Sequence, residues 1–118
     1  MMRRIYITLI ALALVSVTGC SGTGVSKGGY YWGGYSSSYY DLLKNPTDEQ
    51  LQERVSTLED IVQQSHGKGL LVPPGVHAEL ASAYMKQGLG EQAKENFRIE
   101  ISLYPESEMF IRRLVDDL

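Results

Sequence analysis

The sequence of 118 residues contains a single cysteine, Cys20, so no disulfide bond can form within the chain. It has only two histidines, His66 and His77, and neither has a cysteine near it, so no zinc-type metal site is predicted. Its longest apolar stretch is the 13 residues from Ile5 to Val17, which is shorter than the ~20 residues that a membrane-spanning helix needs. These absences argue against a domain stabilised by disulfide bonds, a metal-binding domain and a permanent membrane-spanning helix.

The first 19 residues have the features of a secretory signal peptide. Arg3 and Arg4 precede the apolar stretch, and small residues close it. The stretch ends in Val17-Thr18-Gly19-Cys20, which resembles the lipobox of bacterial lipoproteins at all four positions. This resemblance implies that Cys20 receives a diacylglycerol, that residues 1–19 are removed and that the new amine is acylated. The alternative is a chance Gly-Cys pair within an ordinary secretory signal.

The expected product is a lipid-anchored chain with a flexible start. Each buried methylene contributes about 0.8 kcal/mol to membrane binding, so two or three acyl chains hold far better than one. Ser21 rather than Asp follows Cys20. By resemblance to lipoprotein sorting in Gram-negative bacteria, this favours the outer membrane, more on its periplasmic face than at the cell surface. Residues 20–29 are rich in Gly and Ser and predict a flexible tether, followed by one small domain over residues 30–118.

The charge balance narrows the class of partner. Loss of Arg3 and Arg4 with the signal leaves nine basic residues against 14 acidic ones, a net charge of −5. This charge argues against nucleic acid or anionic lipid headgroups as partners through bulk electrostatics.

Apolar periodicity and helix stop signals predict an all-α domain. Asn45-Pro46 and Pro105 end helices, and Thr47 with Gln50 forms a capping box. The predicted helices cover about 34–44, 47–65, 76–87, 91–104 and 106–118.

The helix pair at 74–107 resembles a tetratricopeptide repeat. The matching residues are Leu80, Ala81, Tyr84, Ala93, Phe97 and Pro105, spaced as in a 34-residue frame. Two residues depart from the pattern: His77 replaces a large apolar residue, and Glu100 replaces Ala. One repeat cannot bury both of its own faces, so the resemblance implies a tetratricopeptide-like stack of about five short helices. The pair at 34–44 and 47–65 fits a degenerate earlier repeat.

Residues 30–40 contain five of the eight tyrosines and the only tryptophan. Their rings could form part of the core, a patch for a partner protein, or a contact with the membrane interface, and carbohydrate stacking stays open. As partner-binding residues we select Trp32, Tyr35 and Tyr39. The second choice is the groove-lining side of the repeat, made of His77, Tyr84 and Glu100. We expect the stem of Glu100 to reach out of this groove.

The mature chain also resembles a family of small, uncharacterised proteobacterial lipoproteins. The residues that carry the resemblance are Tyr31–Tyr35, Val72–Ala78 and Tyr104–Ser107. That family has no established activity, and its genes tend to lie beside those of a lipoprotein resembling the CsgG curli-export pore and of another small lipoprotein. By association, this implies a place in an envelope or export assembly with a CsgG-like partner.

These observations favour a helical protein-binding module. A structural or quality-control lipoprotein without a dedicated partner is the second hypothesis. An enzyme is the third, because the sequence contains no acid–base constellation. We predict no cofactor and no small-molecule substrate.

Overall fold

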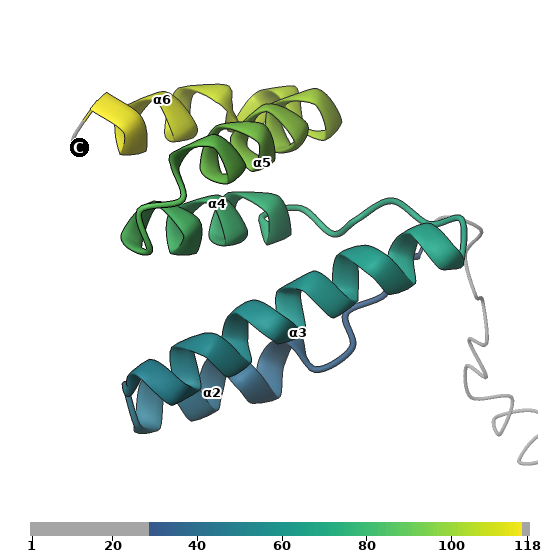
Figure 1. Cartoon of the computed structure of the whole chain (residues 1–118). Coiled ribbons are helices and arrows are strands. Elements are labelled where there is room, and N and C mark those ends of the chain that lie inside the picture. Colours follow the sequence, from purple (N-terminus) through teal and green to yellow (C-terminus); the bar gives the residue numbers. More distant parts are fainter. Residues whose placement is uncertain (1–28, 117–118) are drawn as a thin grey trace, which may run out of the picture.

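The structure is a computed structural model that describes residues 29–116. Throughout this range the regular structure is helical, as the sequence predicts (Figure 1). The predicted signal segment 1–19 and the predicted lipidation site Cys20 lie outside the described residues. The elements are α2 (Tyr35–Lys44), α3 (Asp48–Gly67), α4 (Val76–Lys86), α5 (Gly90–Leu103), the 3₁₀ helix η2 (Pro105–Ser107) and α6 (Glu108–Asp116).

The cap predicted at Thr47 is present at the start of α3. The Thr47 hydroxyl oxygen accepts a hydrogen bond from the backbone N–H of Gln50 at 3.2 Å. Asp48 and Glu49 lie in the first turn, where a negative charge favours the helix. The helix runs two residues beyond its predicted end and stops before Gly69, whose φ of 66° is unfavourable for residues with a Cβ.

The last predicted helix is interrupted near its start. Pro105 opens a 3₁₀ turn in which the backbone N–H and the hydroxyl of Ser107 both donate to the carbonyl oxygen of Tyr104. The α-helix proper begins only at Glu108. The prediction of one continuous helix over 106–118 was therefore wrong at its beginning, and residues 117–118 lie outside the described range.

The helices form two adjoining layers (Figure 1). The α2–α3 pair is joined by a short turn, and the segment 68–75 leads from it to the stack of α4, α5 and α6. Two core clusters stabilise this arrangement, of which only the first joins the two layers. The first joins α3, the connecting segment and α4, through Val55, Leu58, Ile61, Val72, Val76, Leu80 and Ala83. The second joins α4, α5 and α6, through Ala81, Ala93, Phe97 and Ile111.

The tetratricopeptide-like positions fall where the resemblance requires packing. Leu80, Ala81, Ala93 and Phe97 are buried, and Tyr84 is half-buried between the two clusters. Helix α4 contributes to both cores. Its consecutive residues Leu80 and Ala81 point into different cores. This helix is consequently the central element of the domain.

Candidate functional site

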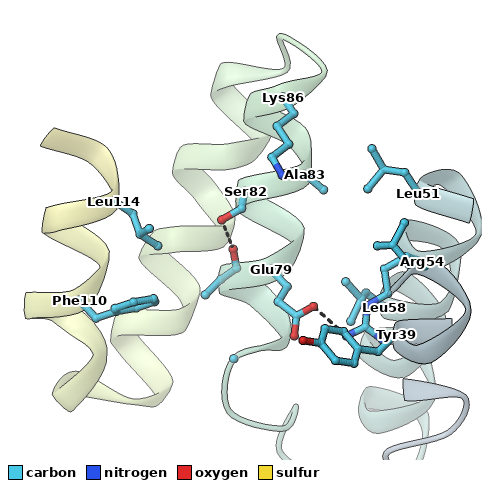
Figure 2. Close-up of a pocket in the computed structure, with 13 residues that line it drawn as sticks. Tyr39, Leu51, Arg54, Leu58, Glu79, Ser82, Ala83, Lys86, Phe110 and Leu114 are labelled. Atoms are coloured by element: carbon cyan, nitrogen blue, oxygen red, sulfur yellow. Dashed lines mark hydrogen bonds and ion pairs between the residues drawn. The ribbon is translucent and has the colours of Figure 1, made fainter. Parts of the chain in front are cut away.

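A groove of about 400 Å³ runs along the side of α4 that the two cores leave uncovered. Figure 2 shows α4 as its floor, with α3 and Tyr39 of α2 on one side and α6 on the other. The lining residues are Tyr39, Leu42, Leu51, Arg54, Leu58, Gly75, Ala78, Glu79, Ser82, Ala83, Lys86, Phe110 and Leu114.

Two aromatic side chains on opposite sides of the groove remain accessible to water. Phe110 on α6 is 61% exposed, and Tyr39 on α2 is also exposed. Burying an aromatic or aliphatic side chain of this size gains about 1.5–3 kcal/mol, so a second molecule that covered these rings would be stabilised. The groove thus has the character of an apolar docking surface.

A buried ionic cluster lies between the floor of the groove and its α3 side, centred on Arg54 of α3, which is only 3% exposed. Its Nη2 donates to the Glu79 carboxylate at 2.7 Å. Its Nη1 donates to the Ser38 hydroxyl at 2.9 Å and to the backbone oxygen of Tyr35. The Tyr35 hydroxyl donates to the other oxygen of Glu79. The cluster therefore links α2, α3 and α4 through one guanidinium.

The aromatic rings of α2 also face this cation. The guanidinium carbon of Arg54 lies 4.1 Å from the centroid of the Tyr35 ring and 5.4 Å from that of Tyr39. Burial raises the pKa of Tyr35 above its ordinary value, and the bond to Glu79 raises it further, whereas Arg54 acts in the opposite direction. Tyr35 therefore serves as a neutral hydrogen-bond donor at physiological pH.

The polar groups of the floor are engaged in structural bonds. The Ser82 hydroxyl donates to the carbonyl oxygen of Ala78 one turn earlier at 3.0 Å. The two oxygens of Glu79 accept from Tyr35 and Arg54. A partner in the groove would therefore meet mainly apolar surface, the exposed Lys86, and one carboxylate, about a third exposed, that is already neutralised.

The three aromatic residues selected from the sequence have different environments. Tyr39 lines the groove, and Tyr35 is half-buried against the first core and bound to Glu79. Trp32 is 42% exposed and contacts Tyr35 edge-on, with ring centroids 5.0 Å apart. The segment is thus neither wholly core nor wholly patch. Whether a partner contacts these rings stays a prediction.

The second set of selected residues lies elsewhere than we expected. His77, Tyr84 and Glu100 do not line the groove, which α4 forms with Ala78, Glu79, Ser82 and Lys86 instead. Residues at positions 77, 80, 81 and 84 of α4 lie on its other side, against the neighbouring helices. His77 and Glu100 are buried and Tyr84 borders a different depression, so the expected place of these residues in one groove was wrong. Whether a partner contacts them stays a prediction.

Glu100 is 2% exposed, so the expectation that its stem reaches out was wrong. Its Oε1 accepts a hydrogen bond from the backbone N–H of Gly75 at 2.8 Å. Gly75 is the N-cap of α4 and has no side chain that could cap it. Glu100 therefore brings a carboxylate to the positive end of α4 from the neighbouring helix, which explains its departure from the repeat pattern.

His77 is also buried, at 3% exposure. Its Nδ1 lies 2.8 Å from the side-chain oxygen of Asn96, which fixes the ring against α5. Within the part of the chain that the structure describes, the second nitrogen of His77 and the second oxygen of Glu100 have no hydrogen-bond partner. Both side chains are thus buried in the structure and not exposed on its surface.

Tyr84 borders a separate, shallower depression of about 360 Å³ between α3 and the α4–α5 pair. Its hydroxyl donates to the carboxylate of Glu59 at 2.6 Å. Burial, and next the bond to Glu59, raises the pKa of Tyr84 to about 12. The bond between Tyr84 and Glu59 therefore links α4 to α3 at a second place, apart from the Arg54–Glu79 pair.

Sequence reasoning missed Arg54, Glu79 and Phe110. A signal for Arg54 was present, because it lies one turn before Leu58 on the buried side of α3, among Val55 and Ile61. A charged residue within such a stripe indicates a buried ion pair. Phe110 was assigned to an apolar stripe of the last helix, and nothing in the local sequence indicated that this stripe faces a groove.

Two further properties concern residues 29–116 only. Nowhere in this range do three or more His, Cys, Asp or Glu side chains gather closely enough to hold a metal ion. None of the helices described here combines the length and apolar character needed to cross a membrane.

Comparison with known proteins gives one match. A family model described as a domain of unknown function (DUF4810) matches residues 30–114, which is most of the described domain. No curated protein and no solved structure matches the chain.

Proposed function

The chain belongs to the DUF4810 family of unknown function, and from this premise we propose that it is an outer-membrane-anchored periplasmic lipoprotein whose helical domain binds another protein of an envelope or export assembly. The lipobox resemblance of Val17–Cys20 supports the anchor, and the resemblance to lipoprotein sorting supports the outer membrane. The genetic neighbourhood of the lipoprotein family that the chain resembles makes a CsgG-like lipoprotein the first candidate partner.

The groove along α4 is the observation that carries the binding role. It is mainly apolar, it has the volume of a ligand-sized cleft, and exposed rings of Tyr39 and Phe110 flank it. A single apolar side chain scattered on a surface needs no explanation, but apolar residues from four helices that meet in one concave site do.

The shape and chemistry of the groove favour a peptide segment with one apolar face. Helices α3 and α6 stand on either side of α4, so an amphipathic helix of the partner could lie between them. Apolar side chains of that helix would contact Leu51, Leu114 and the two rings, and Phe110 and Tyr39 would act as the aromatic anchors.

The experiment is capture of the lipidated, C-terminally tagged protein from its native envelope in mild detergent. We expect one envelope protein in stoichiometric amount. The Phe110→Asp variant should lose it, because the change places a charge in the apolar groove. The Met109→Asp variant should retain it, because Met109 is exposed on the same helix but does not line the groove.

Loss of the partner in both variants, or in neither, would contradict a role for the groove. A Cys20→Ala control tests whether capture requires the anchor. If the lipidated protein is recovered alone, the alternative of a structural or quality-control lipoprotein without a dedicated partner takes precedence.

A further inference from the structure

The described chain begins beside the C-terminal end of α3 (Figure 1). Lys68, the C-cap of α3, places its ammonium 5.4 Å from the centroid of the Tyr31 ring. Tyr104 donates to the backbone oxygen of Val72 at 2.6 Å, and its pKa is raised by burial and by the neighbouring Tyr30 hydroxyl. These contacts place residues 30 and 31 at the same end of the molecule as the connecting segment after α3.

This end of the molecule carries a small set of exposed apolar and amphipathic side chains. Trp32 and Tyr30 are both exposed and contact each other edge-on, with ring centroids 6.2 Å apart. Leu71 is exposed and adjoins Val72. Lys68 is exposed, and its ammonium lies over the ring of Tyr31, the residue between Tyr30 and Trp32. We call Tyr30, Trp32, Lys68 and Leu71 the proximal patch.

The proximal patch has the composition that favours the boundary between lipid headgroups and acyl chains. Trp and Tyr concentrate at this depth because each combines an apolar ring with a polar group. The flexible stem of a lysine lets its ammonium stay among the headgroups while its methylenes lie deeper. The net charge of −5 on the mature chain means that such contact would be driven by the apolar groups.

We propose that the proximal patch lies in the interface of the bilayer that holds the lipid anchor and sets the orientation of the domain on the membrane. This inference rests on the lipidation at Cys20 in the proposed function. Only eight residues, 21–28, separate the anchored Cys20 from the described chain. Even fully extended they reach about 30 Å, and as a flexible chain about 15–18 Å.

The tether itself does not provide an occupant for the patch. Residues 21–29 are Ser-Gly-Thr-Gly-Val-Ser-Lys-Gly-Gly, with one apolar side chain larger than a methyl group. A membrane that is tethered to the described chain through so few residues is, in contrast, present at high effective concentration beside the patch. The groove along α4 is then left for the protein partner, so the two surfaces have different occupants.

Trp32 is the only tryptophan in the sequence and therefore reports on the patch directly. The lipidated protein is purified from its envelope without its partner and incorporated into phosphatidylcholine vesicles. One set of vesicles contains lipid brominated in the upper part of the acyl chain, and the other does not. We expect the Trp32 emission to shift to shorter wavelength in both sets and to lose intensity in the brominated set.

Two variants locate the contact. Leu71→Asp should reduce the quenching by brominated lipid, because it places a charge in the patch. Leu89→Asp is the matched control, since Leu89 is also exposed but lies in the turn between α4 and α5. It should leave the quenching unchanged. Circular dichroism of both variants checks that the helices are retained.

Flotation of the vesicles tests the lipid anchor independently of the contact between the proximal patch and the membrane. If the protein floats but brominated lipid leaves Trp32 unquenched, the anchor stands and the inference is overturned. It is also overturned if Leu71→Asp and Leu89→Asp are quenched equally. If the protein does not float, the anchor fails and the inference fails with it. Protection of Trp32 from iodide only when a protein partner is added would assign the patch to that partner.

Discussion

Arg54 of α3 and Glu79 of α4 form an ion pair with 2.7 Å between Nη2 and Oε2, and the arginine is almost completely withdrawn from water. The pair lines the groove, where the Tyr35 hydroxyl also donates to Glu79 and the Ser38 hydroxyl accepts from Arg54. A buried cation of this kind is costly unless its partner stays in place. The folded state therefore requires α4 to stay in place against the α2–α3 layer.

The first prediction concerns this pair. Glu79→Gln removes the neutralising charge while keeping the shape of the side chain, so we expect the free energy of unfolding to fall by about 2–3 kcal/mol in urea titrations. Glu91→Gln is the control. Glu91 is also in the first turn of its helix and pairs with Lys94, but both side chains are exposed, so we expect a loss below about 0.5 kcal/mol. Equal losses of unfolding free energy in the two variants would contradict the prediction, because the buried pair would then stabilise the fold no more than the exposed pair does.

The second prediction separates the two properties of Glu100. Glu100→Gln retains an oxygen that can accept from the N–H of Gly75, whereas Glu100→Leu does not. We expect the leucine variant to lose about 1–2 kcal/mol of stability and the glutamine variant less. Hydrogen exchange at the Gly75 amide should accelerate mainly in the leucine variant. Similar exchange in both would show that the charge, rather than the acceptor, supports the start of α4.

The third prediction concerns alkaline pH. The folded chain keeps its proton on Tyr84 up to a pKa of about 12, whereas the ordinary value in the unfolded chain is 10.0. The contribution of protonated Tyr84 to the free energy of unfolding is fully present below pH 10. It is lost as the pH rises toward 12, because Tyr84 in the unfolded chain releases its proton first. The raised pKa values of Tyr35 and Tyr104 act in the same direction. Unfolding free energies measured across this window should therefore fall with pH.

The contribution of Tyr84 to this slope can be isolated. Tyr84→Phe should unfold with a shallower decline above pH 10 than the parent protein, although it is less stable at neutral pH because the bond to Glu59 is gone. Tyr40→Phe alters an exposed tyrosine of α2 and serves as the control. If the Tyr84→Phe slope equals that of the parent, the pKa of Tyr84 does not govern the alkaline transition.

The fourth prediction compares two glycines whose added Cβ would meet open space. Gly75 has a φ of 92°, so Gly75→Ala should lower the free energy of unfolding by about 1–2 kcal/mol through backbone strain alone. Gly67 is the last residue of α3 and lacks a positive φ, so Gly67→Ala should raise it by up to ~1 kcal/mol. Urea titrations should thus give changes in the free energy of unfolding that have opposite signs in the two variants. A neutral Gly75→Ala would indicate that the turn before α4 can rearrange.

The all-helical fold was predictable because its determinants are local. Thr47 and Pro105 mark helix limits by their own chemistry, and the apolar stripe from Val55 to Ile61 repeats at helical spacing. The one misplaced start, at Glu108, arose where Pro105 and Ser107 form a 3₁₀ turn that has a similar sequence signature to the beginning of an α-helix.

The groove was not predictable in the same way because it depends on which side of α4 its neighbours cover. His77 and Glu79 lie two positions apart, and only the packing of α3 and α5 decides that the first is buried and the second lines the groove. The place of Arg54 among Val55, Leu58 and Ile61 indicates that it is buried, but Glu79, 25 residues later in the sequence, resembles a solvated charge. Long-range pairing of this kind leaves no mark in local periodicity.

Leu80 and Ala81 are consecutive residues that point into two different cores. An insertion or deletion of one residue between them would turn the remainder of α4 by about 100° and withdraw side chains from both cores at once. The length of α4 is therefore fixed in a way that the length of the turn 87–89, which contributes no residue to either core, is not. Loop grafts, affinity tags or reporter insertions should be accepted in the turn 87–89 and rejected anywhere inside α4.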